Sequence, residues 1–149
     1  MKNFFGCLVF ICLAPIATTA AESCVTVEAS SDWTSLTLDH GDFKTFTTSG
    51  SWTTDAARLD PVGPFGHKGK FGQGGIPEFD ALYYQGTYSK FGEVLMRTPS
   101  QVTGPIEDFR VMVSNGGNPL IPRKGDTVEL RINDTTLDNN AGNLRICIQ

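Results

Sequence analysis

The residues of this chain best suited to chemistry are concentrated in residues 132–142, INDTTLDNNAG, where five of the eleven are Asp or Asn. Hard cations such as calcium take about six to eight oxygen ligands from carboxylates, amide side chains, backbone carbonyls and water. Four such side chains lie within seven residues: Asp134, Asp138, Asn139 and Asn140. Asn and Asp are also common in hairpin turns, because they tolerate left-handed backbone angles. Composition alone therefore leaves a calcium-binding loop and a plain turn open.

Strands are expected to position this loop. Apolar residues that alternate with polar ones, with β-branched and aromatic residues between turn signals, are typical of half-buried strands. Seven runs show this pattern: CVTVEAS (24–30), WTSLTL (33–38), FKTFTTS (43–49), GEVLMRT (92–98), FRVMVS (109–114), DTVELRI (126–132) and NLRICI (143–148). No run has a helical stripe, so we predict an all-β fold, an antiparallel β-sandwich; closure into a barrel stays open on the pattern alone.

The first residues have the pattern of a secretory signal peptide. Lys2 precedes an apolar run that is followed by small residues. We predict a leader over residues 1–20, cleaved after Ala20 or Ala21, and one β-sandwich domain over residues 21–149. The apolar run is too short for a transmembrane helix, and no other run is long enough to span a membrane. The mature protein is thus expected to be secreted or periplasmic.

Cleavage would leave two of the four cysteines, Cys24 and Cys147, near the two ends of the mature chain. In an oxidising compartment, we expect them to form a disulfide that joins the terminal strands. The alternative is two free thiols buried in adjacent strands. Loss of Lys2 with the leader takes the net charge from −4 to −5. An acidic chain argues against a nucleic-acid partner, which would need a basic face.

Several segments resemble, in order, the calcium-dependent PA-I-type galactophilic lectins of bacteria. The segment INDTTLDNNAGNLRICI resembles their C-terminal calcium and sugar loop, in which Asn-Asp is followed by a loop, Asn-Asn, a small residue, Gly and a last strand. Upstream, GDFKTFTTSGSW, VGPFG and GEVLMRT resemble a Gly-Trp segment, a Gly-Pro-x-Gly turn and the strand that follows. The resemblance runs through most of the mature chain and implies a galactose-binding-like β-sandwich.

The resemblance assigns ligands residue by residue. Asp134 matches the calcium carboxylate of the family, and Asn139 and Asn140 match its paired side-chain ligands. The residue three beyond the Trp contributes a backbone carbonyl in these lectins, which falls here at Asp55, three residues after Trp52.

The middle of the loop departs from the family, because it is shorter here. A second backbone carbonyl would come from Thr136 or Leu137. Asp138 is an additional carboxylate that would either join the shell or block the place of a sugar hydroxyl. With the ion, Asp134, Thr135, Asn139 and Asn140 would contact the sugar.

The resemblance therefore implies a Ca2+ cofactor and a carbohydrate partner, since two sugar hydroxyls complete the shell of the ion in these lectins. It implies no particular sugar, because His67 stands too early to match the His that helps select galactose. Related lectins form tetramers, so a homo-oligomer is an open expectation. The other class of function is a structural or protein-interaction module in which calcium stiffens the loop or is absent.

Aromatic residues of the Gly- and Pro-rich region 60–92 offer a platform for a sugar ring or, alternatively, core packing: Phe65, Phe71, Tyr83, Tyr84 and Tyr88. Trp33 and Trp52 lie in strand-like runs and are expected in the core. Catalysis is not expected, because the chain has two histidines and no G-x-S-x-G motif. A carboxylate pair for glycoside cleavage stays open among Glu78, Asp80 and Glu93.

Overall fold

The computed structural model describes residues 21–69, 71–73, 76–78, 81–116 and 120–149. The expected signal peptide, residues 1–20, lies outside the described residues. No helix in the described part of the chain has the length and hydropathy needed to cross a membrane.

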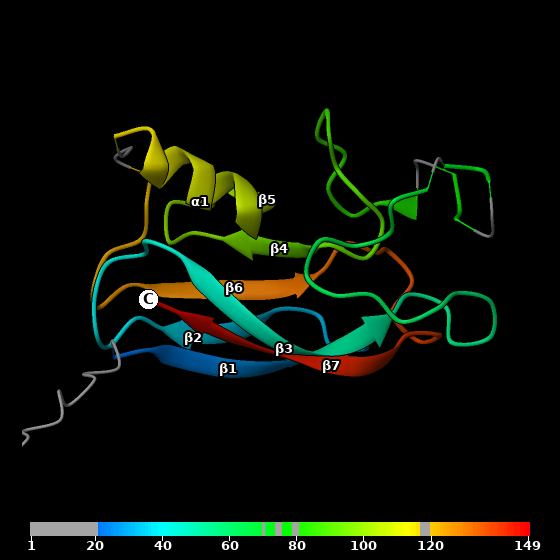
Figure 1. Ribbon diagram of the computed structural model, residues 1–149, viewed down its shortest axis with the longest axis horizontal. Helices are drawn as coiled ribbons and strands as arrows, with labels where there is room; N and C mark the ends of the chain where they lie inside the picture. The colour runs from blue at the N-terminus through cyan, green and yellow to red at the C-terminus, as the bar shows by residue number, and fades with distance from the viewer. Residues whose placement is uncertain (1–20, 70, 74–75, 79–80, 117–119) are drawn as a thin grey trace, which may run out of the picture.

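Three strands form one antiparallel sheet in the order β1 (Ser23–Glu28), β7 (Ala141–Ile148) and β3 (Phe46–Thr53). Four strands form the other, in the order β2 (Thr34–Thr37), β6 (Thr127–Ile132), β4 (Val94–Arg97) and β5 (Thr103–Pro105). Figure 1 shows the two sheets packed as layers. The predicted antiparallel β-sandwich is confirmed.

Alternate side chains of the two sheets meet in one hydrophobic core. The first sheet contributes Trp52, Leu144 and Ile146, and the second contributes Leu130 and Ile132, all fully buried. Successive strand residues face opposite sides of a sheet, so one face of each strand supplies the core. The expectation that Trp52 is a core residue is confirmed.

The expected disulfide is present and joins Cys24 to Cys147. The two cysteines are direct cross-strand partners in the β1–β7 pair. The bond therefore ties the first strand of the domain to its last.

The strand predicted over residues 109–114 is wrong, because this segment belongs to helix α1 (Ile106–Ser114). Ile106 and Phe109, three residues apart, are buried on one face of the helix. Pro105 immediately precedes the helix, and acidic residues occupy its first turn, where they complement the helix dipole. Phe109, Val111 and Val113 alternate as in a strand, but they do not share a buried face, because Val111 is 44 % exposed.

Trp33 is not a core residue, contrary to expectation. Its ring is half-buried and contacts Tyr83 edge-to-face, with the ring centroids 5.7 Å apart. The guanidinium carbon of Arg97 lies 4.3 Å from the Trp33 ring centroid, and that of Arg131 lies 3.9 Å from the Tyr83 ring centroid. The Trp33 ring, just before β2, is thus covered by Tyr83 and by guanidinium groups rather than by the apolar core.

Loops gather at the end of the sandwich opposite the C-terminus (Figure 1). The pairings Thr53 with Ala141 and Val94 with Ile132 place the end of β3, the start of β7, the end of β6 and the start of β4 at this end. The Asp- and Asn-rich loop and the long irregular region therefore leave the sheets side by side.

Candidate metal centre

The candidate site forms where the loop between β6 and β7 meets the segment after β3. The backbone N–H of Ala56 donates to the carbonyl of Asn139 at 3.1 Å. Gly142 permits this approach, because it has a φ of +84° and a Cβ there would stand 2.5 Å from the Ser51 carbonyl oxygen. The glycine that follows the Asn pair thus brings the loop against β3.

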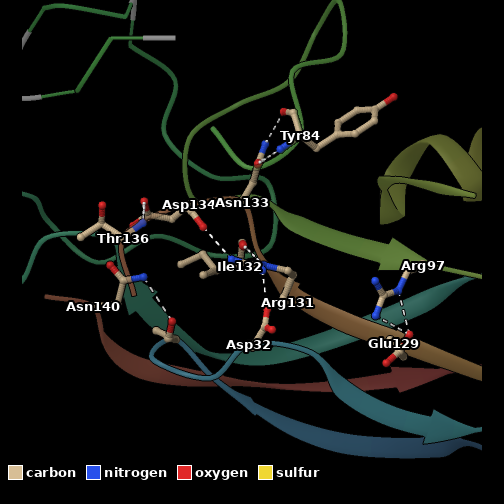
Figure 2. Close-up of polar contacts among 11 residues, drawn as sticks. Asp32, Tyr84, Arg97, Glu129, Arg131, Ile132, Asn133, Asp134, Thr136 and Asn140 are labelled. Atoms are coloured by element: carbon tan, nitrogen blue, oxygen red, sulfur yellow. Dashed lines mark hydrogen bonds and ion pairs between the residues drawn. The ribbon is translucent and has the colours of Figure 1, made fainter. Parts of the chain in front are cut away.

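Asp134 directly follows the buried Asn133 at the end of β6 and is only 1 % exposed. Its Oδ1 accepts a hydrogen bond of 2.9 Å from the backbone N–H of Thr136 (Figure 2). Its Oδ2 is buried and has no hydrogen-bond partner among the described residues. Burial raises the pKa of Asp134, and the Thr136 N–H opposes the shift. The carboxylate therefore has an acceptor oxygen that the described residues leave unsatisfied.

Asn140 supplies a second such oxygen. The residue is 8 % exposed, and its Nδ2 donates to the carbonyl of Ala29 at 3.2 Å. Because a carbonyl must face the nitrogen, this bond defines the orientation of the amide and identifies the other atom as Oδ1. That oxygen is buried without a hydrogen-bond partner in the described part of the chain.

Asp134 and Asn140 lie close together. The Asn140 side chain lowers the pKa of Asp134, although no hydrogen bond of ordinary geometry reaches Oδ2. In Figure 2, Asn140 lies beside the turn formed by Asp134 and Thr136.

A cavity of about 250 Å³ opens beside Asp134, and Asn140 is not part of its lining. Its lining includes Thr54, Asp55, Arg58, Asp134, Thr136 and Asn139. The structure therefore brings together four of the residues singled out in the sequence, from two segments about 80 positions apart in the chain.

Three other expected contributors lie differently. Asp138 is exposed and does not line the cavity. The carbonyl of Leu137 accepts the Asn140 N–H at 3.3 Å, while its side chain packs against the core. Both the N–H and the hydroxyl of Thr135 donate to the Ala81 carbonyl at 3.0 Å.

The Asp55 carbonyl also has partners, because it accepts the N–H groups of Arg58 and Leu59 at 3.1 and 2.9 Å. A carbonyl has two lone pairs, so these bonds compete with a metal for the same oxygen. The Asp55 side chain bonds within its own turn, where its Oδ1 accepts the Ala57 N–H at 3.1 Å.

Two residues outside the sequence-based set position the loop. The Arg131 guanidinium donates through Nη2 to the Asp134 carbonyl at 2.7 Å and pairs with Asp32 (Figure 2). Asn133, to which the sequence pattern assigned no ligand role, is fully buried. Its side chain bonds the backbone of Tyr84 and Lys90. Neither role has a sequence signal, since both depend on partners far along the chain.

The remaining candidate residues are dispersed. Glu78 is exposed, Glu93 is buried, and Asp80 lies outside the described residues. His67 approaches Thr54, with Nε2 3.3 Å from the hydroxyl, and burial lowers its pKa. It does not itself line the cavity.

One other group of potential metal ligands gathers in the described part of the chain, Glu22 with Cys24 and Cys147. The two sulfurs are bonded to each other, so neither is a thiolate that could hold a metal. This group is therefore no alternative to the site at Asp134.

The donor set at Asp134 fits a hard cation. Calcium prefers uncharged and carboxylate oxygens, and the two buried oxygens without partners are one of each kind. Comparison with protein-family models, curated proteins and solved structures gave no match to this chain. The resemblance to the lectins consequently rests on the quoted segments alone.

Proposed function

We propose that this protein binds one Ca2+ ion at the β6–β7 loop and binds carbohydrate through that ion. The observation that supports the proposal is the pair of buried oxygens, Asp134 Oδ2 and Asn140 Oδ1, without hydrogen-bond partners among the described residues. Leaving a buried acceptor unsatisfied costs about 1–3 kcal/mol. A cation bound in the cavity that Asp134 lines would remove that cost at Oδ2.

Asn139 and Asp55 would complete the protein part of the shell from the lining of the cavity. Asn139 and Thr136 are exposed at its rim. A bound Ca2+ would supply coordination positions for two sugar hydroxyl oxygens. Asn139 and Thr136 would contact the same sugar. A purely structural ion needs a shell closed by protein atoms. The carboxylate best placed in sequence to close it, Asp138, lies outside the cavity.

The proposed setting is outside the cytoplasm. The disulfide between Cys24 and Cys147 is typical of oxidising compartments, and the leader-like residues 1–20 imply export to the periplasm or the medium. The proposed activity is binding without turnover. Assembly into a homo-oligomer would let one protein cross-link several glycans.

Thermal unfolding of the mature protein with excess Ca2+ and with a chelator tests the proposal. A ligand that binds only the folded state stabilises it by about 2.7 kcal/mol at 100 times its dissociation constant, so the midpoint should rise with Ca2+. Mg2+ at the same concentration is the control ion for the effect of Ca2+ on the midpoint. A glycan array run with and without Ca2+ then tests sugar binding. An unchanged midpoint refutes the metal site, and a raised midpoint without Ca2+-dependent glycan binding refutes the lectin activity.

A further inference from the structure

A second cavity, separate from the calcium loop, has a volume of about 550 Å³. This lies within the range of about 300–1,000 Å³ usual for small-molecule sites. Its walls include Phe65, Tyr84, Tyr88, Ser89, Glu93 and Asp108, and we name it the aromatic cavity. None of these residues lines the cavity beside Asp134.

Aromatic rings are presented to solvent at this cavity. Tyr88 is 88 % exposed, and Phe65 is one of the few other large apolar residues of the described chain that is well exposed. A turn in which the Ser89 N–H donates to the Gly86 carbonyl at 3.1 Å carries Tyr88 at its tip. At 88 % exposure the Tyr88 ring contributes little to the core, so its face is free for a ligand, whereas the Phe65 ring also lies 6.3 Å from the Phe46 ring, centroid to centroid.

Ser89 adds a polar group inside the same cavity. It is 6 % exposed, and its hydroxyl has no hydrogen-bond partner among the described residues. A buried hydroxyl normally finds a partner, so this one is available to a ligand that both donates and accepts. Glu93, also buried, adds a carboxyl group to the same lining.

The loop that carries Tyr84, Tyr88 and Ser89 is held in place by Asn133. Asn133 donates from Nδ2 to the carbonyls of Tyr84 and Lys90 at 3.1 and 3.2 Å, and it accepts the Tyr84 N–H at 2.8 Å. Figure 2 shows the Asn133 side chain directed at the Tyr84 backbone. The loop is therefore organised without a ligand, as in most small-molecule sites.

Charges around the aromatic cavity are close to balance. Glu107 is neutralised by Arg110, whose Nε donates to it at 2.8 Å. Lys90 and Asp108 carry opposite charges on the same lining. Burial raises the pKa of Glu93 to about 7, so it is only partly ionised near neutral pH. A balanced lining favours an uncharged ligand over a strongly charged one.

We infer that the aromatic cavity is a second, metal-independent binding site for neutral oligosaccharides. The apolar face of a sugar ring would stack on Tyr88 or Phe65, and its hydroxyls would bond Ser89 Oγ and the Glu93 carboxyl. The inference is independent of the calcium proposal, because the six named residues share none of that site's donors.

The test is binding of a panel of neutral hexasaccharides in the presence of a chelator, by glycan array and then by calorimetry. An N-acetylated hexasaccharide and its deacetylated, cationic counterpart form a matched pair within the panel. We expect at least one neutral member to bind without Ca2+, and the acetylated member of the pair to bind at least as well as the cationic one. Absence of binding across the panel, or a clear preference for the cation, would overturn the inference.

Variants locate the site. Tyr88→Ala and Ser89→Ala should each weaken binding about three- to tenfold, whereas Val111→Ala and Ser100→Ala, on residues outside the cavity, should leave it unchanged. Tyr88 is too exposed for its loss to unfold the protein. Asp134→Ala should abolish the calcium effect and keep this binding. Unchanged affinity in both cavity variants would sink the assignment, whatever happens at the calcium loop.

Discussion

The Asn133 Nδ2 lies 3.2 Å from Glu93 Oε1, and this buried contact joins the end of β6 to the residue before β4. The backbone continues the connection, since the Asn133 N–H donates to the Glu93 carbonyl at 2.8 Å. Asp134 follows Asn133 directly and lines the cavity at the β6–β7 loop instead. Two neighbouring residues thus anchor two different candidate sites at the same end of the sandwich.

Asn133→Ala should lower the free energy of unfolding by roughly 2–4 kcal/mol, because it leaves several buried partners unsatisfied at about 1–3 kcal/mol each. These partners are in Tyr84, Lys90 and Glu93. Urea unfolding measures the change. Asn143→Ala is the matched control, since Asn143 is exposed on β7 and should change stability by less than about 0.5 kcal/mol. Equal effects of the two substitutions would contradict the anchoring role.

Glu93 should make stability depend on pH. Burial raises its pKa to about 7 in the folded protein from an ordinary value of 4.5, so the folded state binds the proton more tightly than the unfolded chain does. The stability that protonated Glu93 contributes is fully present below about pH 4.5 and is lost as pH rises through 7. The total loss of unfolding free energy is at most about 3 kcal/mol.

Unfolding free energies at pH 5 and pH 8, measured for the wild type and for Glu93→Gln, isolate this effect. Gln keeps an acceptor for the Lys90 and Asn133 N–H groups but does not titrate. The variant should lose less stability between the two pH values than the wild type does. The same loss in both proteins would show that Glu93 is not the group responsible.

Asp134→Ala should abolish stabilisation by Ca2+, whereas Asp138→Ala should retain it. The first residue is buried with an oxygen that lacks a partner, and the second is exposed outside the cavity. The measurement is the Ca2+-dependent shift of the thermal midpoint. A shift that disappears in the Asp138 variant and survives in the Asp134 variant would reverse the ligand assignment.

Replacement of both Cys24 and Cys147 by Ser should cost about 2–5 kcal/mol of unfolding free energy, because the bond closes a span of 123 residues. Denaturant unfolding of the double variant measures the cost, and the wild type in a reductant should approach the same value. A cost below about 1 kcal/mol would mean that pairing of β1 with β7 holds the ends without the bond.

Gly142→Ala should destabilise more than Gly125→Ala. Both glycines have a positive φ, so each substitution carries the left-handed strain of about 1 kcal/mol. Only at Gly142 would the new Cβ meet backbone, since nothing lies within 4 Å at Gly125. Chemical denaturation compares the two variants, and equal costs would indicate that β3 and β7 move apart without penalty.

Local periodicity was sufficient to predict the sandwich, because alternating residues on both sheets face one core and this pattern is visible along each strand. It failed over residues 109–114, where Phe109, Val111 and Val113 alternate like a strand. The helix there depends on Ile106 and Phe109 packing together against the sheet, a tertiary contact with no signal of period two.

The sequence by itself determined the strand pattern, the two cysteines that pair and the loop rich in Asp and Asn, since these depend on residue type and near neighbours. Only the tertiary structure decided which loop atoms lack partners, that Asp138 points elsewhere and that Asn133 anchors two loops. It also brought Phe65, Tyr88 and Asp108 together around the aromatic cavity. Such properties depend on which distant segments meet, and burial and hydrogen bonding there are fixed only when the two sheets close on their common core.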